Sequence, residues 1–275
     1  MQVIEGRKLV YRHCPQCNTD NNGVKPHAYS PSEWDLKVCA NCGFVYLDAA
    51  PVYEELLEDF AWEKTSNARH EKRKKKHPIL YKLSKATRWR LHLLKRKTME
   101  DLLPEFVSAG KVVDLGCGKG HQLMKLPDNY LAIGIEISTA EAKVAEKLLA
   151  VRSGLVINKS SLEGLQSLSA GEVSAVFMRS YLEHETRPKE VLQETFRVLR
   201  GGGVAIIKVP NYGCVNRVVM GSNWCGFRFP DHLNYFTPET LKNMIHGVGF
   251  EVARFNFMDH LPTGDNMWMV IRKPA

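Results

Sequence analysis

The chain has 275 residues, 44% of them hydrophobic, which is enough for one full α/β domain and a small appendage. Its formal net charge is +8, yet residues 64–97 hold fourteen Lys and Arg against one acid, Glu71, so the remainder is acidic overall. The sequence has no apolar leader and no uninterrupted apolar run of about 18 residues. From these features we expect neither a transmembrane helix nor a signal segment, and they predict a cytoplasmic protein.

Two C-x-x-C pairs lie near the N-terminus. Cys14 and Cys17 form the first pair, Cys39 and Cys42 form the second, and 21 residues separate them. Two such pairs close a tetrahedral Cys₄ shell with no open position, which is typical of a structural zinc site. The sequence therefore predicts a zinc ribbon over residues 1–50 that binds Zn²⁺. Four unrelated reduced cysteines or a redox pair are the alternatives.

Residues 51–104 are predicted to form a basic helical segment. Beyond Pro78, one side of the helix would be apolar and the opposite side basic, the basic side being formed by Lys82, Lys85, Arg88, His92 and Arg96. A docked helix with a solvated basic face is one interpretation. The other interpretations are that the basic side contacts phosphate groups of a substrate, an anionic membrane surface or RNA. No aromatic residue interrupts the run 74–76, which disfavours a base-stacking platform.

A glycine-rich turn follows the first apolar strand of the C-terminal half. The strand runs into Asp114 and then into Gly116-x-Gly118-x-Gly120, and the next apolar strand ends in Glu136. Glycines allow the backbone of such a turn to approach a ligand, and an acid after the second strand accepts hydrogen bonds from ribose hydroxyls. This pattern predicts a doubly wound α/β sheet that binds an adenosine-bearing cofactor.

The elements expected after this turn alternate between helices and buried strands. We expect helices over 143–150 and 191–199, the latter starting at Pro188, and a further helix from Thr237. We expect strands over 154–157, 173–178 and 204–209, the last after a glycine break at 201–203, and a closing pair over 250–257 and 266–272.

The order of these motifs resembles the class I S-adenosylmethionine-dependent methyltransferases. The D-x-G-x-G-x-G turn and the later run LEH…RP…VLQETFRVLRGGG…IIKVPN carry the resemblance, and the methyltransferase domain would span residues 105–275. It implies a Rossmann-like seven-stranded sheet with an antiparallel last strand. It also implies a cofactor site in three parts. Asp114, Gly116, Cys117 and Gly118 would surround the methionine moiety, Glu136 would bind the ribose, and Ile137, Ser161 and Leu162 would lie beside adenine. Arg179 would lie near the sulfonium or the acceptor.

The N-terminal run CPQC…CANCGFVYLDAAPVYEELLEDF resembles the ribbon of bacterial methyltransferases that act on sugars, nucleotide-linked sugars and natural-product intermediates. The resemblance implies that the ribbon forms one wall of the substrate pocket. It implies transfer of a methyl group from S-adenosylmethionine to a hydroxyl of a small molecule, which would bear phosphate if the basic segment contacts it.

Histidines are the candidate bases for a hydroxyl acceptor. His184 follows Glu183 just after the fourth strand, and His232 lies in the aromatic-rich segment Asn223–Phe236, here named the acceptor lid, together with Tyr235. These three residues are the predicted catalytic residues, and a loop histidine next to the helix start is the alternative for His232. Quinone-type methyltransferases place a metal at the Glu-His pair with another acid three residues earlier, where this chain has Ser180, so no catalytic metal is predicted.

Two other functions stay open. The first is an RNA methyltransferase that binds nucleic acid through the ribbon and the basic helix. Against it, the position after the fourth strand reads Arg179-Ser-Tyr-Leu and lacks the Asn/Asp-Pro-Pro-aromatic motif of amino-directed nucleic-acid methyltransferases. The second is an inactive binding protein that retains the cofactor fold, which the intact glycine turn and Glu136 disfavour.

Overall fold

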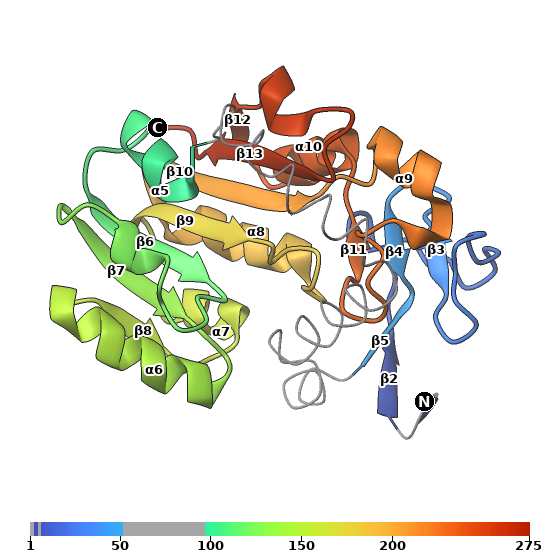
Figure 1. Ribbon diagram of the computed structural model, residues 1–275, viewed down its shortest axis with the longest axis horizontal. Coiled ribbons are helices and arrows are strands. Elements are labelled where there is room, and N and C mark those ends of the chain that lie inside the picture. The colour runs from blue at the N-terminus through green and yellow to red at the C-terminus, as the bar shows by residue number, and fades with distance from the viewer. Residues whose placement is uncertain (1–2, 5–6, 52–96) are drawn as a thin grey trace, which may run out of the picture.

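The structure is a computed structural model that describes residues 3–4, 7–51 and 97–275 (Figure 1). Its strands are β1 Val3–Ile4, β2 Arg7–Tyr11, β3 Leu36–Val38, β4 Val45–Leu47, β5 Ala49–Pro51, β6 Gly110–Leu115, β7 Tyr130–Ile135, β8 Leu155–Ile157, β9 Val173–Arg179, β10 Leu199–Pro210, β11 Asn234–Tyr235, β12 Glu251–Arg254 and β13 Asn266–Arg272. Its α-helices are α5 Met99–Leu102, α6 Thr139–Leu149, α7 Ser161–Gln166, α8 Pro188–Val198, α9 Val215–Met220 and α10 Pro238–His246. Its 3₁₀ turns are η2 Leu103–Glu105, η3 Leu123–Lys125, η4 Ala150–Arg152, η5 Gly221–Asn223 and η6 Phe257–His260.

A seven-stranded mixed sheet forms the centre of the fold, in the order β12-β13-β10-β9-β6-β7-β8. The strands from β10 to β8 run parallel, whereas β13 is antiparallel to both of its neighbours. The chain lays β7 and β8 on one side of β6 and then β9 and β10 on the other. Ligands of open α/β sheets bind outside the carboxyl ends of the strands at such a reversal. The α/β class and the predicted seven-stranded sheet with an antiparallel last strand are confirmed.

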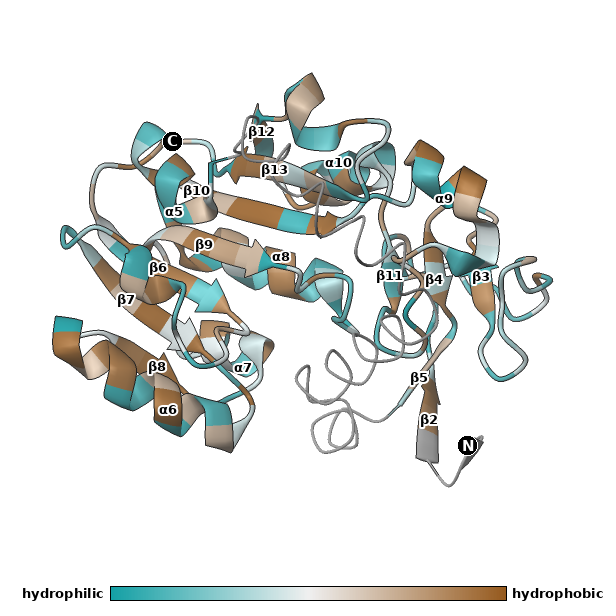
Figure 2. Cartoon of the chain, in the orientation of Figure 1, coloured by the Kyte–Doolittle hydropathy of each residue, from teal (hydrophilic) through white to brown (hydrophobic). Residues whose placement is uncertain are grey.

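Both faces of this sheet are buried because successive side chains of a strand point to opposite faces. On β6, Val113 and Leu115 join a core with residues of α7, α8 and α10, whereas Val112 joins a core with residues of α5 and α6. This explains the apolar colouring of the central strands in Figure 2. No helix within the described residues is long and apolar enough to cross a bilayer.

One predicted boundary is wrong. Strand β10 begins at Leu199, directly after α8, instead of at Val204. The glycines at 201–203 lie inside the strand, where the pairing with β9 shifts register between Leu199 and Val204. A side chain at Gly203 would meet the Arg200 carbonyl oxygen at 2.9 Å, so the glycines permit a close backbone approach instead of ending the helix.

The N-terminal region, residues 7–51, shares a small sheet with the acceptor lid. Strand β11 of the lid pairs antiparallel with β4, which pairs with β3 (Figure 1). The Leu47 N–H also donates to the Leu233 carbonyl oxygen over 2.9 Å. Two parts of the chain almost 190 residues apart are therefore joined by main-chain bonds. Residues 52–96, which contain most of the predicted basic helix, lie outside the described residues.

Candidate cofactor and acceptor sites

The glycine turn lies at the carboxyl end of β6. Gly116 and Gly118 adopt positive φ values of +67° and +54°, which residues with a Cβ rarely adopt. The amides of Gly116 and Cys117 both donate to the Ile135 carbonyl oxygen, over 2.9 and 3.2 Å. These bonds attach the turn to the end of β7, so the predicted cofactor residues of both strands lie together.

Glu136, directly after β7, holds the turn in place. Its Oε2 accepts from the Gly118 amide and its Oε1 from the Ser138 amide, both over 2.8 Å, and the residue is buried. Each carboxylate oxygen has a second lone pair. The same side chain can therefore shape the turn and still accept hydrogen bonds from two ribose hydroxyls.

Asp114 lies at the carboxyl end of β6 and is buried. Burial raises the pKa of this carboxyl to about 7; nearby Arg179 opposes the rise, and the carboxylates of Glu100 and Glu136 add to it. A carboxyl that is close to half-ionised at neutral pH favours a cationic ligand, which would complete its deprotonation.

Arg179, the last residue of β9, pairs with a carboxylate that the sequence analysis missed. Its Nη2 lies 2.5 Å from Oε1 of Glu100, a buried residue of α5. The signal for this helix was present, because Thr98 and Asp101 form a capping box at its start. The pairing largely balances the charge of Arg179, which reduces its repulsion of a nearby sulfonium.

The predicted adenine residues gather at the next strand. Ser161 and Leu162 begin α7 and are buried, and Ile137 is half-buried. Asn158, which the sequence analysis also missed, donates from Nδ2 to the carbonyl oxygens of Glu136 and Ile137 over 2.8 and 3.0 Å. The side-chain amide of Asn158 thereby fixes the segment that carries Glu136, the predicted ribose-binding residue.

Tyr181 belongs to the loop after β9 and lies beside the glycine turn. A Cβ on Gly116 would lie 3.5 Å from its ring, and its hydroxyl donates to Glu185. The Tyr181 carbonyl oxygen accepts from the His184 amide over 2.9 Å. The loop that carries His184 therefore begins directly beside the cofactor turn.

The structure brings His184 and His232 together. Their ring centroids lie 4.7 Å apart with the planes at 85°. Nδ1 of His184 lies 2.8 Å from the Asp231 carbonyl oxygen, and Nδ1 of His232 lies 2.8 Å from that of Gly226. A carbonyl oxygen only accepts hydrogen bonds, so Nδ1 carries a proton in both rings, and in the neutral form of each ring Nε2 carries the lone pair.

Glu183 adjoins these histidines. It is 1% exposed, and burial raises the pKa of its carboxyl to about 8. One ligand atom from each of Glu183, His184 and His232 lies within 4.8 Å of the others, a grouping that could also hold a cation. The predicted absence of a catalytic metal stays a prediction.

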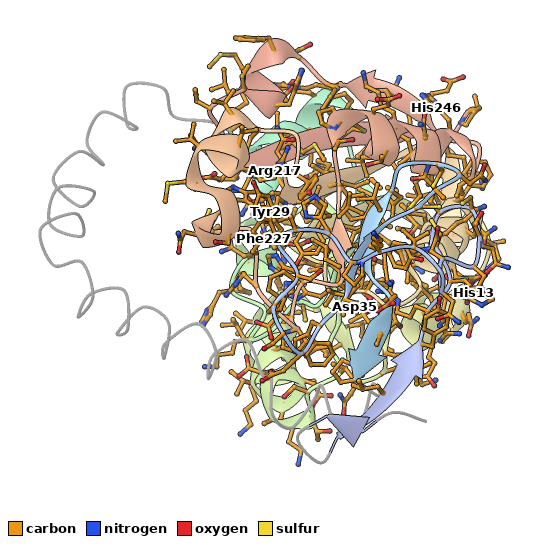
Figure 3. The ribbon with its side chains drawn as sticks, turned by 90° about the vertical axis from the view of Figure 1, so that its right-hand side faces the viewer. His13, Tyr29, Asp35, Arg217, Phe227 and His246 are labelled. Carbon is orange, nitrogen blue, oxygen red and sulfur yellow. The ribbon has the colours of Figure 1, made fainter. Side chains whose placement is uncertain are left out.

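The acceptor lid is held by aromatic packing. Tyr235 is 2% exposed and its ring lies among those of Phe227, Phe229 and Tyr212. Tyr29 of the N-terminal region contacts Phe227 with ring centroids 5.5 Å apart, and Figure 3 shows both beside Arg217. This packing explains Tyr235 without a catalytic role, and its predicted role stays untested.

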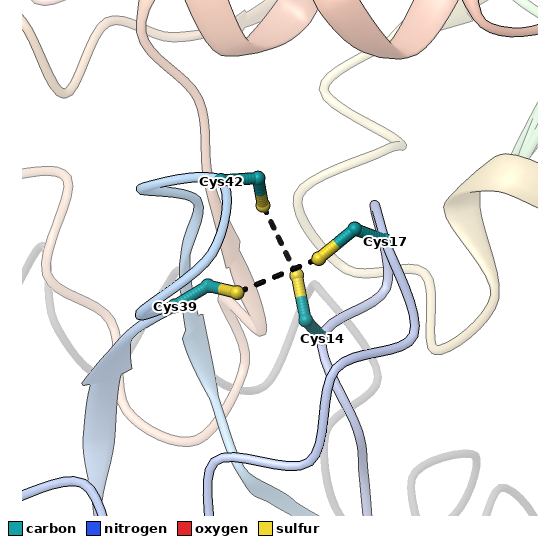
Figure 4. A group of neighbouring side chains, drawn as sticks. All are labelled: Cys14, Cys17, Cys39 and Cys42. Carbon is teal, nitrogen blue, oxygen red and sulfur yellow. Dashed lines mark hydrogen bonds between the residues drawn. The ribbon is translucent and has the colours of Figure 1, made fainter.

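The four predicted zinc ligands converge (Figure 4). The Sγ atoms of Cys14 and Cys42 lie 3.5 Å apart, as do those of Cys17 and Cys39, and all four atoms lie within 4.8 Å of one another. A disulfide needs an S–S distance of about 2.05 Å. Zn–S bonds of about 2.3 Å in a tetrahedron require S–S edges near 3.8 Å, which this group fits with a small adjustment.

Comparison with known proteins identifies the family. Residues 86–254 match a family model described as a methyltransferase domain. No curated protein sequence matches the chain. Three similar solved structures show the fold alone. The YcgJ protein of Bacillus subtilis has 11% identity and a TM-score of 0.51, covering 63% of this chain and 97% of that one. A putative methyltransferase, solved with a Haloferax volcanii methyltransferase activator, has 17% identity and a TM-score of 0.51, covering 63% and 87%. The [4+2]-cyclase SpnF has 18% identity and a TM-score of 0.50, covering 64% and 80%.

The family match covers more than half of the chain, and the observed sheet order and glycine turn agree with it. The chain therefore belongs to the methyltransferase-domain family and is a class I S-adenosylmethionine-dependent methyltransferase.

Proposed function

We propose that this enzyme transfers the methyl group to a hydroxyl of a small molecule, namely a sugar, a nucleotide-linked sugar or a natural-product intermediate, with His232 as general base. The observation that carries the proposal is the bond between His232 Nδ1 and the Gly226 carbonyl oxygen. It fixes the tautomer whose Nε2 accepts a proton. The aromatic acceptor lid around this histidine suits a ring-shaped acceptor.

The residues of the cofactor side would bind and orient the cofactor. Glu136 would accept hydrogen bonds from the ribose hydroxyls, and Asp114 would face the charged methionine moiety. Ser161 and Leu162 would border adenine. The bound cofactor supplies a methyl group on a sulfonium, which is itself the leaving group. The chain therefore has to align the acceptor and exclude water.

The proton balance of the step assigns a role to each histidine. As the acceptor oxygen gains the methyl group, its proton passes to Nε2 of His232, and the resulting imidazolium keeps its Nδ1–H bond to Gly226. His184 has the same tautomer, so its Nε2 would accept a hydrogen bond from a second hydroxyl of the acceptor. Buried Glu183 lies next to both rings, and in its ionised form, which burial disfavours, it would stabilise the imidazolium.

Substitution of His232 tests the proposal. In His232→Ala we expect turnover to fall by about 10²–10⁴-fold while cofactor affinity stays near that of the wild type. Turnover is measured as S-adenosylhomocysteine released with a panel of nucleoside-diphosphate sugars, and separately with RNA. His246→Ala is a matched control, because Nδ1 of His246 also bonds a carbonyl oxygen, that of Phe250. His246 is the last residue of α10 and lies away from Phe227 of the acceptor lid (Figure 3). An unchanged rate in His232→Ala would refute the base, and turnover with RNA alone would refute the acceptor class.

We also propose that Cys14, Cys17, Cys39 and Cys42 bind one structural Zn²⁺. The support is the convergence of four sulfur atoms and the backbone amides around them, including those of Gln16 and Asn41, which bond to Cys14 and Cys39. Saturated protein ligation leaves no position for a substrate. The zinc would fold the N-terminal region without entering the chemistry.

A further inference from the structure

We infer that Arg12, in the N-terminal region, is a positioning residue that fixes the two histidines of the acceptor site. The inference rests on the role proposed above for His184 and His232. Arg12 lies directly after β2 and only two residues before Cys14, far from the cofactor turn in sequence. It is 8% exposed, so its guanidinium has to find its partners inside the protein.

The partners of Arg12 come from three separate segments. Nη2 donates to the Thr186 carbonyl oxygen over 3.0 Å and to Asn234 Oδ1 over 2.9 Å. Nη1 donates to the carbonyl oxygens of Leu47 and Leu233 over 3.2 and 3.5 Å. One side chain thus bonds the N-terminal region, the loop after β9 and the acceptor lid.

Asn234 extends this connection to the loop that carries His184. Its Nδ2 donates to the carbonyl oxygens of Leu182 and Glu185 over 2.8 and 2.6 Å, on either side of His184. The Glu183 carbonyl oxygen accepts from the amides of Leu233 and Asn234 over 2.7 and 3.1 Å. The guanidinium, the Asn234 amide and these main-chain bonds fix the distance between the two loops that carry the histidines.

The chemistry of this position requires a fork of donors. A guanidinium offers five N–H groups in a plane, whereas an ammonium is a compact point charge that cannot span four acceptors in fixed directions. The four hydrogen-bond acceptors of Arg12 are neutral oxygens, and the nearby carboxylates of Glu185 and Asp48 attract its charge in addition. The Arg12 amide is itself fixed by the Asp48 carbonyl oxygen over 2.6 Å.

The test compares Arg12→Gln with Arg152→Gln. Arg152 is a matched control because it also donates to four carbonyl oxygens, those of Leu123, Leu126, Pro127 and Tyr130, which lie before or at the start of β7. The readouts are kcat, KM, cofactor affinity, and the imidazole ¹⁵N–¹H resonances, assigned by histidine substitution. For Arg12→Gln we expect kcat to fall about 100-fold, cofactor affinity to stay within about threefold, and the Nδ1–H resonances of His184 and His232 to shift or broaden.

Arg152→Gln should leave those resonances and kcat in place. Arg12→Lys should behave like Arg12→Gln, and its full recovery of kcat and resonances would overturn the need for the fork. Asn234→Ala breaks the same connection from the other end, so it carries the test if Arg12→Gln fails to fold. The double variant should lose little more than either single variant, because both remove one connection.

The outcomes separate this inference from the proposed function. If Arg12→Gln changes neither the resonances nor kcat, the positioning role is wrong, whatever His232→Ala does. If Arg12→Gln moves the resonances while His232→Ala keeps its turnover, the base is wrong and the positioning role stands.

Discussion

The cofactor side and the acceptor side of this enzyme are built in different ways. Most of the cofactor side comes from one continuous stretch, residues 114–162, whose bonds join neighbouring strands and turns. The acceptor side comes from three segments, and the Arg12 bonds that join them span 174 and 222 residues of sequence. The first site is formed by the sheet itself, whereas the second also receives bonds from the N-terminal region.

This difference separates binding from turnover. Contacts between near neighbours form with the sheet, but contacts between distant segments need each segment to be ordered first. Damage to the N-terminal region should therefore remove methyl transfer and spare cofactor binding. Damage to the glycine turn should instead weaken cofactor binding. The predictions below test this separation, beginning with the largest expected effect.

Loss of a zinc ligand should have the largest effect. Cys39→Ser breaks the Cys₄ group, and metal closure of such small modules contributes about 10–16 kcal/mol in isolated peptides. We expect metal analysis to fall from one zinc per chain to none, turnover to fall about 100-fold or more, and cofactor affinity by calorimetry to stay nearly constant. Cys225→Ser, at an exposed cysteine, should keep its zinc.

Two results would contradict this prediction. Equal losses of cofactor affinity and turnover would show that the two sides fold as one unit. A metal ion retained by Cys39→Ser would remain on the other three cysteines or lie at the Glu183, His184 and His232 group, and the second location would count against His232 as the general base.

Removal of Glu136, the proposed ribose-binding acid, should have the next largest effect. Glu136→Ala loses the two bonds to the Gly118 and Ser138 amides along with the ribose contacts. We expect cofactor binding to weaken by roughly 2–4 kcal/mol, measured by titration calorimetry. Glu172→Ala is the control, because its carboxylate also accepts from a backbone amide, that of Ser169, but lies at the opposite end of β9. Near-unchanged affinity in Glu136→Ala would refute the placement.

The sequence predicted the strand ends and the glycine turn of the cofactor side because the signals for these elements are local. The positions of Asp114, the glycines and Glu136 are set by strand ends and by a turn that demands positive φ. What it missed there was side-chain support from elsewhere. Glu100 comes from a short helix before the sheet, and Asn158 looked like an ordinary loop residue.

The acceptor side was predicted only in part because no local pattern encodes its assembly. His184 and His232 were chosen separately, and nothing in either motif showed that the rings would meet. Arg12 lies in a strand-like run where a basic residue usually faces solvent, and its burial depends on a lid more than 200 residues away. The same long range hid the pairing of β11 with β4.

Overpacking of the cofactor turn should have a smaller effect. A Cβ at Gly134 would lie 2.5 Å from the Sγ of Cys117, inside the contact between β7 and the turn. We expect Gly134→Ala to destabilise the fold by about 1–3 kcal/mol in denaturant unfolding and to weaken cofactor binding in parallel. Adding Cys117→Ala removes the clashing sulfur and should restore most of the loss. If the double variant is no better than the single one, the clash is not the cause.

The smallest expected effect is a change of cofactor affinity with pH. Burial raises the pKa of Asp114 to about 7, so at pH 6 most of the free enzyme carries a neutral Asp114. A cationic cofactor binds the ionised form, so affinity should rise about tenfold from pH 6 to pH 8, and Asp114→Asn should flatten this dependence. The same shift makes the free fold less stable as the pH rises from 3.8 toward 7, since the unfolded chain releases a proton that the folded chain keeps.

Glu183→Gln is the control for the pH dependence, because it removes a buried carboxyl from the acceptor side instead of from the cofactor side. Glu183 is also a buried carboxyl, with a pKa raised by burial to about 8, but it belongs to the acceptor side. Its replacement should leave the pH dependence of cofactor affinity in place and change only that of turnover. If Glu183→Gln flattens the affinity curve instead, the ionisation of Glu183 on the acceptor side affects cofactor binding. The separation between binding and turnover then fails, and the loop of Tyr181, where the two sides touch, is the place of contact.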